Sequence, residues 1–291
     1  MQGRLVPPVE GRIQAFPVGC WEQEFANATA AGLDAIEWIY DAYGLGANPI
    51  ESSEGIERVN ELAAGNGVAV RSLCADYFMD FPFVRATEAE RRERTERLNW
   101  LIAQASRIGV TRIVLPFVDG SAILDEADRK VVVDAVRAAL PAARERAVEL
   151  HLETSLSPAE FASLMEALPD TLIKVNYDSG NSASLGYVPA EEFSAYGHRI
   201  GSIHLKDRVR GGGTVPLGTG DADLKAVFEA IRRLNYAGDY VLQVARAEPG
   251  NEVAWAAHHR EIVQEYLKST HPPPTYQPTD LPTYQPADPS K

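Results

Sequence analysis

The sequence predicts an α/β fold: a single barrel of eight parallel strands, each followed by a helix, with a proline-rich tail behind it. Over residues 1–268, short apolar runs rich in Val, Ile and Leu alternate with longer amphipathic segments. Such runs are typical of strands buried on both faces, and strict strand–helix alternation indicates a parallel sheet. Eight units in about 260 residues fit a (β/α)₈ TIM barrel. An open doubly wound sheet is disfavoured, because its first strand should lead into a Gly-rich turn, and here Val6-Pro7-Pro8 follows instead.

The apolar runs and the capping residues between them place the individual elements. Ser53, Thr87 and Asp125 are suited to cap helix starts, and Ser157 precedes a proline at a first helical position. The expected strands are Gln2–Leu5, Ala35–Ile39, Ala69–Ala75, Arg112–Pro116, Glu149–Thr154, Leu172–Asp178, Ile200–Lys206 and Tyr240–Val244. The expected helices are Glu22–Ala31, Glu54–Gly65, Glu88–Ile108, Glu126–Val148, Pro158–Ala167, Ala190–Tyr196, Leu224–Leu234 and Glu252–Leu267.

The last residues, 269–291, differ from the rest of the chain. They hold 7 of the 19 prolines and repeat PTYQP twice. Prolines remove backbone donors and fix φ, so we expect a disordered Pro/Tyr-rich tail. It is either a dispensable extension or a docking segment for a partner.

Composition narrows the function. A net charge of −13, from 28 Lys and Arg against 41 Asp and Glu, argues against nucleic acid as a partner. Two cysteines exclude a disulfide scaffold or a Cys-rich zinc site. The start, MQGRLVPPVEGR, has no apolar segment typical of a signal peptide, and no run of 18 apolar residues follows. We therefore expect a cytoplasmic protein that does not bind membranes.

Four polar residues fall at the carboxyl ends of successive predicted strands, where barrel enzymes carry their active sites. They are Glu153, Asp178, His204 and Gln243, separated by 25, 26 and 39 residues, about one strand–helix unit each. Singly, each has an ordinary alternative role as a loop carboxylate, a turn former, a core histidine or a hydrogen-bonding amide. Together they predict a site for one divalent ion, Mn²⁺, Mg²⁺, Co²⁺ or Zn²⁺, because oxygen and imidazole donors suit such ions.

Other residues at the same end are candidates for substrate binding. Strand ends supply carboxylates and an amide, and a basic cluster follows the seventh and eighth strands in an otherwise acidic chain. The cluster is either a pocket for a substrate phosphate or carboxylate, or a set of solvated loop charges. The substrate-binding candidates are Glu37, Asp76, Asn181, Lys206, Arg208, Arg210 and Arg246.

With these residues in view, the chain resembles the sugar phosphate isomerase/epimerase family. These proteins are xylose isomerase-like TIM barrels and include the ketose 3-epimerases. The resemblance covers roughly residues 1–267 and depends on the order and spacing of short motifs. In chain order they are MQGRL, GLDAIEW, HLET, VNYDSGN, IHLKDR, VPLGTGDAD and YAGDYVLQ.

The resemblance implies a metal site and a mechanism, with one departure. The family holds its metal on a Glu, an Asp, a His and a second Glu, and Glu153, Asp178 and His204 match the first three. Gln243 stands where the second Glu is expected. In the epimerases the two glutamates act on opposite faces of one substrate carbon, and an amide cannot act as a base near neutral pH. Glu153 is therefore the expected single catalytic base.

Two further positions can be compared with the ketose 3-epimerases. Asn181 stands where those enzymes have a substrate-binding His, whereas Arg210 keeps the position of their Arg. The first position departs from the family pattern and the second agrees with it.

These expectations combine into a hypothesis about function. We expect a metal-dependent isomerase or epimerase of a sugar or sugar phosphate, in which Glu153 removes a proton α to a carbonyl and an enediolate forms. One alternative is a metal-dependent lyase or dehydratase acting on a keto-sugar or keto-cyclitol. Another is a non-catalytic barrel whose metal site Gln243 has degraded. An apurinic endonuclease is disfavoured by only six histidines. Assembly into a homo-oligomer through the outer helices is left open.

Overall fold

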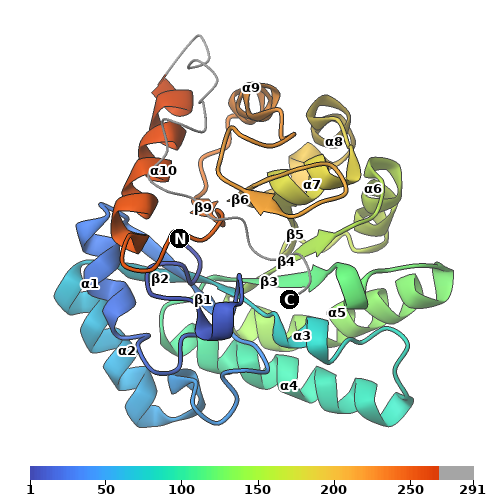
Figure 1. Cartoon of the computed structure of the whole chain (residues 1–291). Coiled ribbons are helices and arrows are strands. Elements are labelled where there is room, and N and C mark those ends of the chain that lie inside the picture. The colour runs from blue at the N-terminus through green and yellow to red at the C-terminus, as the bar shows by residue number, and fades with distance from the viewer. Residues whose placement is uncertain (269–291) are drawn as a thin grey trace.

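The computed structural model describes residues 1–268, so the predicted tail, 269–291, lies outside the described residues. The described chain is a TIM barrel, as predicted, with helices around a nearly closed parallel sheet (Figure 1). Seven strands pair in the order β1-β2-β3-β4-β5-β6-β9. Their bounds are β1 Ala35–Ile39, β2 Ala69–Cys74, β3 Arg112–Phe117, β4 Glu149–Thr154, β5 Ile173–Asp178, β6 Ile200–Leu205 and β9 Tyr240–Leu242.

The gap between β9 and β1 is filled by the start of the chain. The Gln2 amide donates to the Leu242 carbonyl at 3.2 Å, and Gln2 forms a single parallel bridge with Glu37. The prediction of a full strand over Gln2–Leu5 is therefore wrong in extent, although its place in the barrel is right. Gly3, with φ +49°, turns the backbone out of the extended conformation after one bridged residue.

The helices begin close to the capping residues that the sequence offers. Thr87 and Ser157 each form a capping box, with Glu90 and Glu160 respectively. Two short helices, α3 and α7, were not predicted. The α-helices are α1 Gln23–Ala30, α2 Ser53–Asn66, α3 Tyr77–Asp80, α4 Glu88–Arg107, α5 Glu126–Arg146, α6 Pro158–Ala167, α7 Ser179–Leu185, α8 Pro189–Tyr196, α9 Leu224–Leu234 and α10 Glu252–Lys268.

A small hairpin follows β6 at the carboxyl end of the barrel. Its strands, β7 Asp207–Arg208 and β8 Thr214–Val215, are antiparallel. The buried Asp207 carboxylate accepts hydrogen bonds at 2.8–3.0 Å from the backbone amides of Gly218, Gly220 and Ala222. The hairpin and the following loop are thus fixed next to the end of β6, which carries His204.

The apolar core fills the space between the sheet and the surrounding helices. Across residues 1–268, none of the helices is both long enough and apolar enough to span a membrane. The interior of the barrel, in contrast, contains several buried polar side chains, including His151, Asn176 and Ser202. Such groups have to be hydrogen-bonded to be tolerated there.

Candidate functional site

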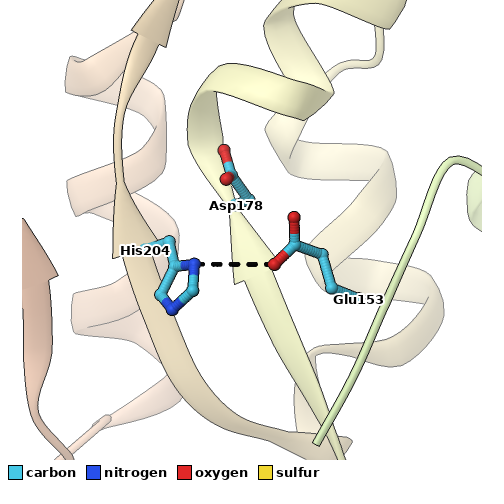
Figure 2. Close-up of side chains that lie close together, drawn as sticks. All are labelled: Glu153, Asp178 and His204. Atoms are coloured by element: carbon cyan, nitrogen blue, oxygen red, sulfur yellow. Dashed lines mark ion pairs between the residues drawn. The ribbon is translucent and has the colours of Figure 1, made fainter. Parts of the chain in front are cut away.

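Three of the four predicted metal ligands meet at the carboxyl ends of neighbouring strands. Glu153 is on β4, Asp178 ends β5 and His204 is on β6, where it pairs in register with Asp178. All three are buried, and one ligand atom from each lies within 4.8 Å of the others. Figure 2 shows Glu153 and His204 facing each other, with His204 Nδ1 3.5 Å from Glu153 Oε2, and Asp178 next to them.

The orientation of His204 is set by Glu37 on β1. His204 Nε2 lies 2.9 Å from Glu37 Oε1, so the opposite ring nitrogen, Nδ1, faces the cluster. Burial lowers the pKa of His204, but the surrounding carboxylates, Glu37 first, outweigh burial and raise it to about 8. A carboxylate behind a ligating imidazole is a recurring support for metal binding, because it fixes the tautomer and the ring plane.

Asp178 offers one free oxygen to the cluster. Its Oδ1 accepts from the backbone amides of Gly180 and Asn181 at 2.9 and 2.8 Å, and so caps α7. Its Oδ2 is buried and has no hydrogen-bond partner, as is also true of His204 Nδ1. Their only charged contacts are longer ion pairs, with Lys206 Nζ at 3.7 Å and Glu153 Oε2 at 3.5 Å respectively. Two buried ligand atoms without a hydrogen bond fit a divalent cation, which would satisfy both.

Glu153 is held by two amides. Its Oε1 accepts from Asn181 Nδ2 at 2.6 Å and its Oε2 from Asn176 Nδ2 at 2.8 Å. Burial raises its pKa to about 7, with a further rise from Asp178 that His204 and Lys206 partly oppose. This pKa is that of the metal-free site, since a divalent cation bound to Glu153 would lower it.

Gln243 follows β9 directly, and its amide has a defined orientation. Its Nε2 donates to Gln2 Oε1 at 2.6 Å, and Arg4 Nη1 donates to the same oxygen at 3.1 Å. Gln243 Oε1 accepts from Lys206 Nζ at 3.0 Å. The carbonyl oxygen of Gln243 is therefore the atom that faces Lys206.

Lys206 lies between the cluster and the solvent. Besides Gln243, its Nζ approaches Asn181 Oδ1 at 3.4 Å and Asp178 Oδ2 at 3.7 Å. Its side chain is only 14% exposed. The ammonium thus partly compensates the charge of Asp178, and it must move if an ion is to reach both Asp178 Oδ2 and Gln243 Oε1.

A pocket of about 270 Å³ opens beside the cluster. Arg208 crosses its edge, with Nη1 2.9 Å from Asn181 Oδ1 and Nη2 2.7 Å from the Gly212 carbonyl. A second cavity, of about 320 Å³, includes the amino ends of β1 and β9 and contains none of the three clustered ligands. The lining of the first includes Gln14, Asp41, Cys74, Asp76, Asp80, Asp119, Glu153, Asn181, Lys206, Arg208 and Gln243.

Three predicted substrate-binding residues do not line this pocket. Glu37 stands behind His204. Arg246 donates to the carbonyls of Ile13 and Val6, both at 2.9 Å, and so holds the segment after the first bridge. Arg210 is exposed in the turn that connects β7 and β8. Contact between these three and a substrate stays a prediction that the geometry does not favour.

Several residues around the site were missed in the sequence. Gln2 and Arg4 belong to the segment predicted as the first strand, and listing that strand's side chains would have found them. Asn176 precedes Asp178 by two positions, so strand alternation already placed it on the same face. Gln14, whose Nε2 donates to Asp76 Oδ2, lies in a loop that carries no recognisable signal.

Fold and site together define a class of protein: a TIM barrel with a buried Glu–Asp–His cluster at the carboxyl ends of its strands, next to a polar pocket. Residues 25–266 match the family model described as xylose isomerase-like TIM barrel. The chain belongs to this family, and with it to the sugar isomerase/epimerase superfamily.

Similar proteins include enzymes of two reaction types. The chain is 28% identical over 267 residues to L-ribulose-5-phosphate 3-epimerase UlaE of Shigella flexneri, covering 84% of this chain and 90% of that protein. It is 23% identical over 227 residues to inosose dehydratase of Clostridium perfringens, covering 66% and 76%.

Solved structures show the same fold. The structure of an L-ribulose 3-epimerase aligns with a TM-score of 0.71 at 19% identity, over 94% of this chain and 98% of that one. The IOLI protein, described with a bound zinc atom, aligns with a TM-score of 0.70 at 17% identity, over 85% and 94%.

Proposed function

We propose that this protein is a divalent-metal-dependent isomerase or epimerase of a sugar or sugar phosphate, with Glu153 as the catalytic base. The observation that carries the proposal is the environment of Glu153. It is buried, both its oxygens are oriented by amides, and it lines the pocket. It also adjoins two potential metal-ligand atoms, Asp178 Oδ2 and His204 Nδ1, that form no hydrogen bond. This combination suits removal of a weakly acidic proton from a bound sugar.

One ion, Mn²⁺, Mg²⁺, Co²⁺ or Zn²⁺, would be held by Glu153, Asp178 and His204, with Gln243 Oε1 as a fourth, neutral donor. When bound, it supplies a Lewis acid that polarises the substrate carbonyl and so acidifies the neighbouring C–H. The IOLI protein, which has the same fold, is described with a bound zinc atom, and this supports a metal in the present protein. Relative to a glutamate, Gln243 leaves one less negative charge on the ligand set.

Glu153 then removes the proton from the carbon next to the carbonyl, which leaves an enediolate. Return of that proton on the same face to the former carbonyl carbon, with transfer of the hydroxyl proton to the former carbonyl oxygen, gives aldose–ketose isomerisation. Inversion of the carbon needs a second proton donor on the other face. The candidates for this donor are Asp76, Glu37 and Lys206. Asp76 and Lys206 line the pocket, whereas Glu37 does not. Burial also raises the pKa of Asp76 to about 6, so a fraction of the molecules carries a protonated Asp76 near neutral pH.

The basic side chains at the pocket suit an anionic substrate group. Lys206 and Arg208 are both in the lining, and both contact Asn181, which in turn holds Glu153. A phosphate at this edge would be close to the base. The similarity to UlaE, an L-ribulose-5-phosphate 3-epimerase, favours a ketopentose phosphate among the candidates.

A lyase is the second candidate, and the similarity to inosose dehydratase favours it. Removal of a proton α to a carbonyl is common to both reactions. In the lyase, a hydroxyl on the next carbon leaves and a double bond forms. A non-catalytic barrel is the remaining alternative, and absence of turnover in metal-loaded protein would support it.

The test is a substrate panel. The protein is stripped of metal and reloaded with each of the four ions. It is then incubated with L-ribulose 5-phosphate, free ketohexoses and a keto-inositol in D₂O. We expect deuterium at the carbon next to the carbonyl of one substrate, and none with Glu153→Gln. Product analysis separates isomer, epimer and dehydrated product. Full exchange by Glu153→Gln under saturating metal would refute the assignment of the base.

A further inference from the structure

A chain of buried polar side chains runs from Glu153 through the interior of the barrel. Asn176 Nδ2 donates to Glu153 Oε2 at 2.8 Å, and Ser202 Oγ donates to Asn176 Oδ1 at 2.6 Å. His151 Nδ1 lies 2.7 Å from Ser202 Oγ, and its Nε2 lies 2.9 Å from Glu149 Oε2. Asn176, Ser202 and His151 are at most 2% exposed. The links therefore run without competing solvent.

The donors and acceptors allow only one direction of hydrogen bonding along this series of side chains, from His151 toward Glu153. The amide of Asn176 must present its NH₂ to the Glu153 carboxylate, so its oxygen faces Ser202. The hydroxyl hydrogen of Ser202 is then used on Asn176, and its oxygen has to accept from His151 Nδ1–H. The contact between His151 Nε2 and Glu149 Oε2 then requires one further proton, carried by the ring or by the carboxyl group. Each group has a single compatible orientation, and so the position of Glu153 Oε2 is coupled to that of the His151 ring.

The far end of the chain is anchored at the beginning of two strands. Glu149 starts β4, and its Oε1 lies 2.6 Å from Lys174 Nζ, near the start of β5. Gly201 makes room for the histidine, since a Cβ there would lie 2.6 Å from His151 Cε1. A register irregularity between β5 and β6 places Asn176 opposite Ser202. Local features of β4, β5 and β6 thus make room for, or fix, each of these hydrogen bonds.

The chain distinguishes the two oxygens of Glu153. Oε2 accepts from Asn176 and lies 3.5 Å from His204 Nδ1, so it faces the other two residues of the Glu–Asp–His cluster. Oε1 is held by Asn181, which lines the pocket, whereas His204 is not among the lining residues. We infer that Asn176, Ser202 and His151 are positioning residues that fix Oε2 toward the metal and leave Oε1 as the basic atom. This inference rests on the proposed function.

Metal affinity tests the inference without relying on turnover. Ser202→Ala breaks the chain two links from Glu153, and we expect it to weaken Mn²⁺ binding by about 10-fold to 100-fold in calorimetric titration, as loss of a supporting contact typically does. The matched control is Ser182→Ala. It removes another buried hydroxyl, which donates to Glu192 Oε1 at 2.6 Å, and should leave Mn²⁺ affinity unchanged. Thermal melting of both variants reports any general loss of structure.

Non-additivity provides the second readout. Asn176→Ala removes the last link, and it also serves if Ser202→Ala fails to fold. The double variant should bind Mn²⁺ no more weakly than Asn176→Ala alone, because both changes break one chain. Additive losses, or equal affinity in Ser202→Ala and Ser182→Ala, would overturn the inference and leave the proposed function standing. A wild type that binds no divalent ion would overturn both.

Discussion

Removing the ammonium of Lys206 should tighten metal binding. Its Nζ is 3.0 Å from Gln243 Oε1 and 3.7 Å from Asp178 Oδ2, two of the proposed ligand atoms. An incoming divalent ion must either repel this charge at short range or displace it from its contacts. Lys206→Met keeps much of the side-chain volume and removes the charge, so both costs disappear.

The size of the effect follows from the distances. A metal–oxygen bond of about 2.1 Å on Asp178 Oδ2 places the ion no farther than about 6 Å from the unmoved ammonium. Even with the dielectric constant of water, charges of +2 and +1 at about 6 Å repel by about 1.4 kcal/mol. This corresponds to about tenfold in the dissociation constant. Because the side chain is largely buried, we expect at least this gain.

The assay is calorimetric titration of metal-free protein with Mn²⁺. The control is Lys130→Met, which removes one exposed lysine paired with Asp134 on α5. Circular dichroism establishes that both variants are folded. Affinity in Lys206→Met equal to or weaker than that of Lys130→Met would refute the idea that the ammonium and the metal exclude each other.

Three further predictions follow. Gln243→Glu should bind Mn²⁺ more tightly than wild type in the same titration, because it restores a carboxylate to the ligand set; unchanged or weaker binding would contradict this. Asp76→Asn should retain exchange of the substrate proton with D₂O but lose inversion, and inversion at the wild-type rate would exclude Asp76 as second donor. His259 is fully buried, and burial lowers its pKa to about 4, so the stability it supports is present above about pH 6.5 and lost as pH falls toward 4. The free energy of unfolding in urea should therefore fall less for His259→Leu than for wild type between pH 7.5 and 4.5, by up to about 3 kcal/mol. An equal fall in both proteins would contradict the lowered pKa of His259.

Most of the fold could be predicted because its signals are local. Buried parallel strands read as short apolar runs, and Thr87 and Ser157 mark helix starts through capping geometry. The first strand could not be delimited in this way. The predicted strand extends to Leu5, but the conformation of Gly3 ends the pairing after Gln2. The hairpin β7–β8 is too short for a periodic signal.

The cluster of Glu153, Asp178 and His204 could also be predicted, since each residue sits at the end of its own strand and neighbouring strands bring them together. Side-chain contacts across the barrel could not. That Glu37 supports His204 from behind depends on which of two ring nitrogens faces it. That Arg246 binds backbone carbonyls depends on the path of the segment around Ile13, which no sequence pattern fixes.

The most direct test of the account is metal content by elemental analysis of wild type and His204→Ala, each after incubation with Mn²⁺, Co²⁺ and Zn²⁺ and removal of free ion. We expect about one equivalent of a divalent ion in wild type and its loss in the variant, in which the Nδ1 atom facing Glu153 and Asp178 is absent. No retained metal in wild type, or equal retention in both proteins, would contradict the metal site on which the proposed reaction depends.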